Sequence, residues 1–469
     1  MDTLINTSQQ TWTRGPSSRG RTKRNQHRNP QSIFTTILLF SSLTVLMPAI
    51  ANAQDSSHPK PIPATRQAML EALDSLKRRE PRLPLSVAAA ESTEPVDGSS
   101  LGVVNNARMR SLYLPSELTR RGGRRGGATD GQFPYEFATE IFWIVSRLNN
   151  CHYCLGHQED KLKRVGVSEA RLVALDSRWT LFSPREQAAF AFAKKLTEQP
   201  HSLTDHDVAD LATHYSSDQI LELAFLVGRY NATNRWTDAL GIPQEDHRVF
   251  RSDLNADELT IASEVTVTAT EPRPQFSDYA TWRQQLDKHM SRPARLQTVA
   301  VATESFDNVV GTSAGDPPSD LPANLPAHLR LLSSVPIAGE PWVAQLQAAE
   351  TVGELPSILR DQIGFVAARE DGAWYMQWYR FARLQQAGMA DEQIALLGTD
   401  TVDIDPATRE ALRFATRLTS APQRITDDDI ESLAVHFNNN QIAEIVYHVG
   451  IAALLDRLTE TAGLVAEKN

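Results

Sequence analysis

Cysteine is nearly absent from this 469-residue chain, which has only two, Cys151 and Cys154, in a CxxC arrangement. A disulfide between them would close a loop too short to remove much entropy from the unfolded chain, so a structural staple is not expected. A structural zinc site needs four ligands around a tetrahedron. The cysteines and the nearby His152 and His157 all fall on one predicted helix, which does not surround an ion. The pair therefore favours dithiol redox chemistry over a metal site or inert cysteines, and no cofactor is expected.

Long apolar runs are also missing, apart from residues 33–47 near the N-terminus. This run is short for a membrane span and is followed by Pro48. Six Lys and Arg residues precede it, and Ala51-Asn52-Ala53 supplies a small-x-small cleavage site. Residues 1–53 are therefore predicted to be a signal peptide, cleaved near Ala53, of a protein exported to the periplasm or the exterior. A membrane anchor formed by an uncleaved leader is the alternative.

Basic residues are in the minority, with 47 Lys and Arg against 57 Asp and Glu. Six of the bases and one acid, Asp2, lie in residues 1–53, so the mature chain has a formal net charge of -15. An acidic surface disfavours nucleic acid and anionic membranes, and neither is an expected partner. The basic cluster at residues 120–127 is interrupted by glycines and is predicted to be a flexible surface loop.

No alternation of apolar and polar residues is long enough to demand a β-sheet, although residues 260–270 look strand-like. Helical spacing of apolar residues is found at residues 133–148, 185–197, 205–215 and 218–231. The last three of these segments follow capping sequences typical of helix starts. An all-α fold made of helical bundles is therefore predicted.

The sequence repeats itself at a constant offset, which becomes longer after a short insertion in the second copy. Arg82 matches Arg295 before the insertion, and after it Glu222 matches Glu444, Gly228 matches Gly450 and Arg235 matches Arg457. The offset that takes Glu222 to Glu444 is called the repeat offset below. Such self-similarity predicts two tandem units. The predicted parts are a disordered leader at 54–66, a first unit at 67–250, a linker with the start of the second repeat at 251–325, and a second unit at 326–469.

The CxxC pair is predicted to lie at the start of a helix. Asn150 suits the N-cap position, and Gly166 suits the C′ position after three basic residues. A helix N-terminus favours thiolate over thiol, and His157 lies one turn after Cys154, where it can act as a base. His152 is predicted to be an exposed polar residue, with electrostatic support of the thiolate as its functional alternative.

The CxxC block, from Glu140 to His157, is followed by a second block at residues 219–241, which contains GRYN and NRWTDALG. Together the blocks resemble the carboxymuconolactone decarboxylase and alkylhydroperoxidase D-like family over residues 100–250. Residues 325–465 resemble it in degenerate form. The resemblance implies an all-α fold and a homo-oligomer, because members of this family usually assemble into trimers or hexamers.

The cysteine-bearing branch of that family also implies roles for single residues. Cys154 would attack a peroxide, and Cys151 would resolve the resulting sulfenic acid as a disulfide. His157 would be the base and Glu140 the acid behind it. The family's glutamate sits one place before Glu140, so Glu136, one turn earlier, is a second candidate for this proton relay.

The second unit lacks these groups. The repeat offset replaces each reactive residue by one without its chemistry, namely Ala373 for Cys151, Met376 for Cys154, Tyr379 for His157 and Gln362 for Glu140. The second unit is therefore predicted to be a scaffold without an active site. Glu222 recurs as Glu444 and is interpreted as structural, with a supporting role at the active site as the alternative.

Three functions remain open on the sequence. The leading hypothesis is an exported thiol-dependent peroxidase, with peroxiredoxin-like activity, that reduces hydroperoxides through a CxxC dithiol/disulfide cycle. A thioredoxin-like or other dithiol reductant would recycle it. The alternatives are a non-redox enzyme of the carboxymuconolactone decarboxylase type and a non-catalytic helical scaffold or binding protein.

Overall fold

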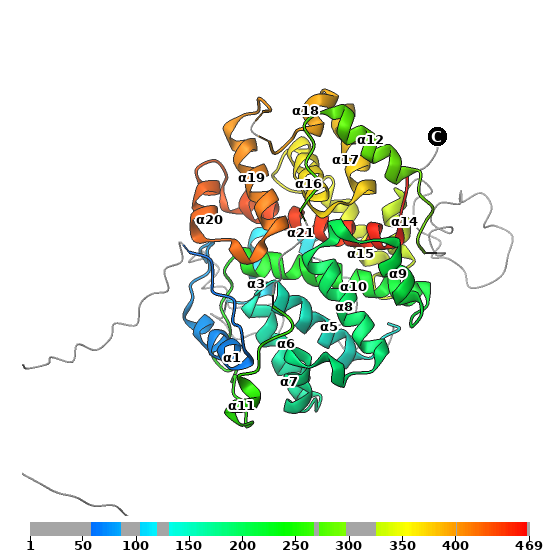
Figure 1. The fold of residues 1–469 in the computed structure, drawn as a ribbon. Helices are drawn as coiled ribbons and strands as arrows, with labels where there is room; N and C mark the ends of the chain where they lie inside the picture. The colour runs from blue at the N-terminus through cyan, green and yellow to red at the C-terminus, as the bar shows by residue number, and fades with distance from the viewer. Residues whose placement is uncertain are drawn as a thin grey trace, which may run out of the picture. The chain divides into compact units, whose positions relative to one another are not determined.

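Helices make up the regular structure of this protein (Figure 1). The computed structural model describes residues 58–85, 104–119, 131–266, 272–296, 325–399 and 401–466. Within these ranges the only β-type pairing is an isolated antiparallel bridge between Thr65 and Ala262. The prediction of an all-α fold is therefore confirmed. The predicted signal peptide, the basic loop and residues 297–324 of the predicted linker lie outside the described residues.

The front half of the chain, meaning residues 58–266, contains the CxxC pair and ten α-helices in its described residues. They are α1 (Arg66–Ser75), α3 (Asn106–Tyr113), α4 (Ser116–Thr119), α5 (Tyr135–Leu148), α6 (His152–Arg164), α7 (Glu169–Ser177), α8 (Pro184–Glu198), α9 (Asp205–Ala212), α10 (Ser217–Ala239) and α11 (Ala256–Leu259). Short 3₁₀ turns lie at Leu76–Arg78, Trp179–Leu181 and Pro200–Ser202.

The back half, meaning residues 272–466, is helical in the same way. Its helices are α12 (Tyr279–Met290), α14 (Ala327–Ser333), α15 (Gly339–Ala349), α16 (Ser357–Asp371), α17 (Trp374–Gln386), α18 (Asp391–Ala395), α19 (Pro406–Ser420), α20 (Asp427–Ala434) and α21 (Asn439–Ala462), with a 3₁₀ turn at Pro422–Arg424.

The predicted capping sequences start their helices. α8, α9 and α10 begin after Ser183, Thr204 and Ser216, and each of these residues forms a capping box with the residue three places on. α10, however, continues to Ala239, beyond its predicted end at residue 231. The sequence pattern ends early because the last turns of α10 are rich in polar residues that find partners inside the protein, as described below.

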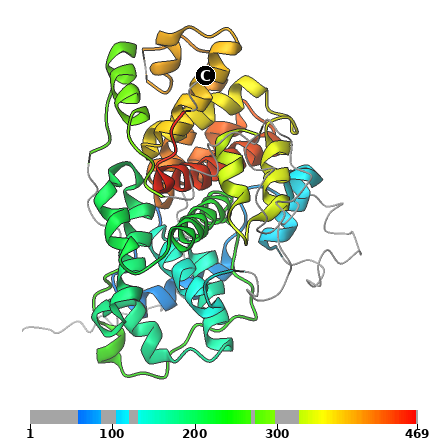
Figure 2. The ribbon, with the colours of Figure 1, turned by 90° about the vertical axis from the view of Figure 1, so that its right-hand side faces the viewer.

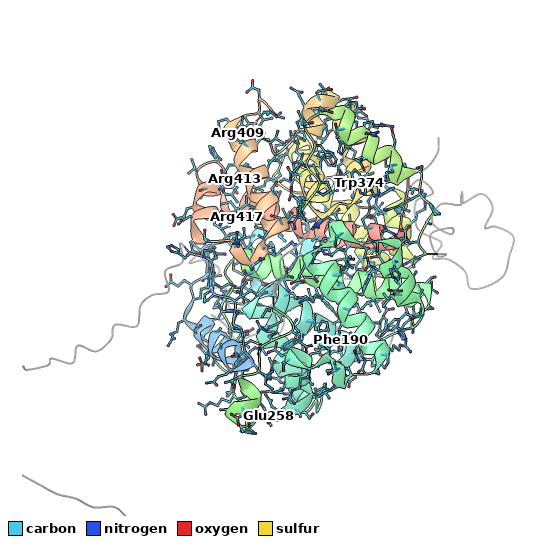
Figure 3. The ribbon with its side chains drawn as sticks, viewed as in Figure 1. Phe190, Glu258, Trp374, Arg409, Arg413 and Arg417 are labelled. Carbon is cyan, nitrogen blue, oxygen red and sulfur yellow. The ribbon has the colours of Figure 1, made fainter. Side chains whose placement is uncertain are left out.

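Each half contains buried aromatic rings, of which Figure 3 labels Phe190 and Trp374. Phe190 on α8 lies 5.1 Å from Phe182 and 6.2 Å from Phe137 between ring centroids. In the back half, Trp374 at the start of α17 stacks on His289 with centroids 4.4 Å apart.

On the outer side of α19, Arg409 and its neighbours Arg413 and Arg417 follow one another at the spacing of a helix turn (Figure 3).

The two long helices α10 and α21 lie side by side (Figures 1 and 2). Gly228 of α10 faces the backbone of Leu454, and Gly450 of α21 faces the backbone of Ala232. These contacts are reciprocal, because the repeat offset turns each one into the other. Glycine lets the two backbones approach because it has no Cβ.

None of the described helices combines the length and apolarity needed to cross a membrane.

Polar contacts between the halves follow the same spacing. Arg235 of α10 donates to the carbonyl of Thr419 at 2.8 Å, and Arg457 of α21 donates to the carbonyl of Thr197 at 3.4 Å. Each arginine is buried, and each carbonyl lies near the end of a helix in the opposite half. Contacts of this kind are what two related units would make. Their origin by duplication stays a prediction.

We expect Gly228→Ala to lower the free energy of unfolding by up to about 2 kcal/mol. The new Cβ would lie 2.9 Å from the carbonyl oxygen and 3.1 Å from the Cα of Leu454, and this backbone cannot rotate away. The resulting overpacking, about 1–3 kcal/mol, outweighs the roughly 1 kcal/mol that alanine gains over glycine in a helix. Urea denaturation measures the difference.

Gly450→Ala is the matched control for this measurement. Its nearest contact, the carbonyl oxygen of Ala232, is 3.3 Å away, so a smaller loss is expected. A Gly228→Ala protein as stable as the wild type would contradict the close approach of α10 and α21.

Candidate active site

The two cysteines lie where the chain passes from α5 into α6. Asn149 ends α5, and Asn150 follows with a φ of 51°, in the left-handed region that asparagine tolerates better than most residues. Cys151 is then the N-cap of α6, and Cys154 lies in its first turn. The prediction that Asn150 would be the N-cap is wrong by one residue, because Asn150 reverses the chain between the helices. The equivalent residue of the back half, Gly372, is also left-handed, with a φ of 68°.

Thr237, in the last turn of α10, contacts both cysteines through its hydroxyl group. Its hydroxyl oxygen lies 3.1 Å from Cys151 Sγ and 3.1 Å from Cys154 Sγ. The same oxygen is 3.1 Å from the carbonyl of Thr233, and a hydroxyl has one proton to donate among these three groups. Both cysteines are free thiols, 0% and 3% exposed. Thr237 was not predicted as a site residue, and its place in the second family-like block is the only signal that could have found it.

Burial dominates the electrostatics of Cys154. Together with the neighbouring Cys151 and the charge of Asp238, it raises the pKa of the Cys154 thiol well above its usual value, against the opposing hydrogen bond of Thr237. Desolvation of a fully buried group changes a pKa by up to about 3–5, which is worth more than the roughly 2 kcal/mol that a helix terminus supplies. The expectation that the helix start would give a Cys154 thiolate is therefore wrong for this conformation.

The ring nitrogens of His157 bind groups other than the cysteines. Nδ1 lies 2.8 Å from the carbonyl oxygen of Tyr153, and Nε2 lies 3.2 Å from Oε1 of Glu245. Both partners are hydrogen-bond acceptors, so each ring nitrogen has a polar partner other than sulfur. Glu245 also pairs with Arg248 at 2.9 Å. Although burial opposes them, the hydrogen bonds and charges of His157 and Arg248 lower the pKa of Glu245 to about 2.

His152 is buried, with 4% of its surface exposed. Its Nε2 lies 3.0 Å from Oδ1 of Asn150. Burial, followed by the positive charges of Lys60, Arg147 and Arg79, lowers the pKa of His152 well below its usual value. The prediction of an exposed residue is therefore wrong, because the turn at Asn150 directs the ring inward. A neutral ring does not hold a thiolate by charge.

Glu140 lies on an earlier turn of α5 and binds Arg171. Its two carboxylate oxygens accept hydrogen bonds from Nε at 2.6 Å and Nη2 at 2.9 Å of that arginine, which also pairs with Glu186 at 2.7 Å. Burial raises the pKa of Glu140, and Arg171 opposes this effect. About 12 Å of helix separates Glu140 from the end of α5 at Leu148, so the structure does not bring Glu140 to the sulfur atoms.

Glu136 and Glu140 both line a cleft of about 740 Å³. Glu136 is exposed at its rim. The cleft reaches Val165 and Gly166, at the end of α6 opposite to the cysteines. Gly166 has a φ of 87° and follows the C-cap Val165, as predicted. The predicted proton relay from a glutamate through His157 to Cys154 is therefore not assembled in this conformation.

Glu222 serves the fold of the front half. Its carboxylate accepts hydrogen bonds from the backbone nitrogen of Gln132 at 2.9 and 3.1 Å. Glu444 accepts from the backbone nitrogen of Glu354 at 2.7 and 2.9 Å, which is the same contact at the matching place of the back half. Glu222 also precedes Thr237 by about 22 Å along α10. These contacts support the structural interpretation of Glu222.

Residues 58–65 lie against the α5–α6 loop. The side-chain amide of Asn150 donates to the carbonyl of Pro61 at 3.2 Å, and the ammonium group of Lys60 donates to the carbonyl of Asn150 at 3.1 Å. Lys60 also pairs with Asp238, the residue after Thr237. The prediction of a disordered leader is therefore wrong for these residues, because their charge and carbonyl groups are bound by the loop. The four residues before them lie outside the described ranges.

Comparison with known proteins gives two partial similarities, and no family model matches the chain. YdfG, an uncharacterized protein of Bacillus subtilis (strain 168), is 27% identical over 101 residues, which span 21% of this chain and 68% of YdfG. YnjA, an uncharacterized protein of Escherichia coli (strain K12), is 28% identical over 103 residues, 22% of this chain and 57% of YnjA. The chain thus covers little more than half of YnjA, and neither name states an activity.

We expect Glu245→Gln to reduce the free energy of unfolding at pH 7 by up to about 3 kcal/mol. The neutral amide loses the ion pairs that lower the pKa of Glu245 to about 2. A depressed carboxyl pKa stabilises the fold fully above the unfolded-state pKa of about 4.3, and this stabilisation is lost as the pH falls through the folded-state value. In urea titrations the difference from wild type should therefore shrink as the pH falls from 5 towards 2, by about 1.4 kcal/mol for each pH unit between the two pKa values.

Glu71→Gln, at an exposed position of α1, is the control and should change stability little at any pH. A Glu245→Gln deficit that stayed constant with pH would mean that the carboxylate charge is not what stabilises this site.

Proposed function

We propose that this chain is an exported thiol-dependent peroxidase that reduces hydroperoxides at Cys151 and Cys154. The observation that carries the proposal is the Thr237 hydroxyl, which lies 3.1 Å from both sulfur atoms and so holds two free thiols next to each other. Adjacent thiols can form and exchange a disulfide. The family resemblance of the CxxC block supports peroxide as the oxidant, and the signal-like residues 1–53 support export.

The proposed reaction has two steps. The thiolate of Cys154 attacks one oxygen of the hydroperoxide, the O–O bond breaks, and the alcohol leaves with a proton while Cys154 becomes a sulfenic acid. The sulfur of Cys151 then attacks Cys154, so that an S–S bond forms, the S–O bond breaks and water leaves. The peroxide gains two electrons and the two thiols lose them. A thioredoxin-like or other dithiol reductant returns these electrons by thiol–disulfide exchange.

The surrounding groups would serve this cycle in different ways. Thr237 can donate its hydroxyl proton to whichever sulfur carries the negative charge. His157 is held on Glu245, so it can act as the base only after its ring leaves that carboxylate. The burial of both sulfur atoms favours small hydroperoxides as substrates. Their shared contact with Thr237 keeps Cys151 beside the sulfenic acid as soon as it forms.

Substitution of the two cysteines tests the proposal. Cys154→Ser is expected to abolish peroxide consumption in the presence of dithiothreitol. In the absence of added thiol, Cys151→Ser should allow one turnover and leave a sulfenic acid on Cys154, which dimedone labelling and mass spectrometry detect. The wild-type rate should rise by about tenfold per pH unit between pH 7 and 9, because burial keeps the thiolate a minority species. A Cys154→Ser protein with the wild-type rate would refute the proposed function.

A second variant tests the observation on which the proposal rests. Thr237→Val keeps the shape of the side chain but removes the hydroxyl, and we expect it to slow the reaction of Cys154 with peroxide by about tenfold through the loss of one hydrogen bond to sulfur. Thr459→Val is the matched control, because Thr459 occupies the equivalent place of α21 without a cysteine partner. Equal effects of the two variants would count against a role for Thr237.

A further inference from the structure

The position of both thiols depends on what holds the end of α10. Arg82, in the segment after α1, supplies much of this support. Its Nη1 donates to the carbonyls of Asp238 at 2.8 Å and Ala239 at 2.9 Å, and its backbone nitrogen donates to the carbonyl of Leu240 at 2.9 Å. These carbonyls lie at the C-terminal end of the helix, where the α-helical donors run out, and the carbonyl of Asp238 also accepts from the backbone nitrogen of Gly241 at 3.0 Å. Thr237 lies in that same turn, directly before the two residues whose carbonyls the Arg82 side chain binds.

Arg82 is in turn held by the back half. Its Nη2 donates to the carbonyl of Ile425 at 3.1 Å, and its Nε pairs with Asp427, the first residue of α20. Arg79 binds the same carboxylate at 3.1 Å. Figure 1 places α20 beside the segment that follows α1. Two arginine side chains, 5% and 14% exposed, therefore share Asp427 as a counter-charge.

The opposite half repeats this arrangement without the cysteines. Arg295, the counterpart of Arg82, donates from its backbone nitrogen to the carbonyl of Ala462 at 3.0 Å and from its guanidinium group to the carbonyl of Glu460. It also donates to the carbonyl of Leu203 at 3.3 Å and pairs with Asp205 at 2.6 Å. The repeat offset takes Asp205 to Asp427, so the two aspartates correspond. The described residues thus contain two such arrangements, in each of which an arginine binds a helix end and an aspartate. Only the helix end bound by Arg82 is part of a helix whose last turn touches sulfur.

We propose that Asp427 is a positioning residue of the dithiol centre. Through Arg82 and Arg79 it fixes the last turn of α10 and with it the Thr237 hydroxyl against Cys151 and Cys154. The back half, which has no cysteine of its own, thereby completes the site of the front half. This inference rests on the dithiol centre of the proposed function, but it does not depend on which oxidant the thiols reduce.

Comparison of Asp427→Asn with Asp205→Asn in the full chain tests the inference. The measured quantities are the rate of alkylation of Cys154 by iodoacetamide, followed by peptide mass spectrometry, and stability in urea. Asp427→Asn removes the counter-charge of two arginines and Asp205→Asn that of one, so the larger loss of stability is expected for Asp427→Asn. Only Asp427→Asn should speed alkylation, by about threefold or more, because loosening the last turn of α10 exposes sulfur atoms that are 0% and 3% exposed. Asp427→Glu should restore most of the slow rate.

The inference is overturned if the two asparagine variants alkylate at the same rate, or if Asp427→Asn folds and alkylates as the wild type does. Should Asp427→Asn fail to fold, Arg82→Lys and Arg295→Lys replace the pair, because lysine keeps the charge but loses the planar donor fork. If the wild type consumes no peroxide but the variants still differ in alkylation, the positioning role stands and the proposed function fails.

Discussion

The close packing of α10 against α21 is the constraint on which the rest of the structure depends. Gly228 and Gly450 let the two helix backbones meet, and this contact sets how far apart the halves lie. At that distance each half can reach the helix end of the other. Arg82 meets Asp427 on one side, and Arg295 meets Asp205 on the other. The last turn of α10 also contains Thr237. The contact between α10 and α21 therefore helps to determine the surroundings of the two sulfur atoms.

The two halves fill the same buried place in different ways. Beneath α6, Arg66 donates to Glu159 at 2.8 and 2.9 Å, and Trp143 donates to the same carboxylate at 2.6 Å. The repeat offset takes Glu159 to Phe381, and the shorter offset that takes Arg82 to Arg295 takes Arg66 to the partly buried Tyr279. These two rings stack with centroids 5.9 Å apart. A buried ion pair adds little net stability over well-packed apolar groups, because desolvation offsets the attraction. The aromatic version of the back half shows that this place can be filled without charge, so stability alone does not explain the ionic network under the CxxC helix.

The sequence predicts what depends on neighbouring residues and misses what depends on distant ones. Ser183, Thr204 and Ser216 start their helices because a cap acts on the next three residues, and Gly166 ends α6 for the same local reason. The internal repeat also anticipates the paired contacts of Glu222 and Glu444. By contrast, the partner of His157 is Glu245, and the partner of Glu140 is Arg171. Neither helix spacing nor family resemblance indicates these partners, because each partner lies on another helix or loop. Each of them binds a side chain that is predicted from the sequence to serve the proton relay at Cys154.

Burial of the dithiol has two opposite effects on the proposed chemistry. It raises the pKa of Cys154, so that fewer molecules carry the reactive thiolate at neutral pH. It also keeps Cys151 within reach of the same hydroxyl, so that a sulfenic acid formed on Cys154 meets a thiol before it meets a second peroxide. A buried centre of this kind gives up speed at neutral pH and gains protection from irreversible oxidation.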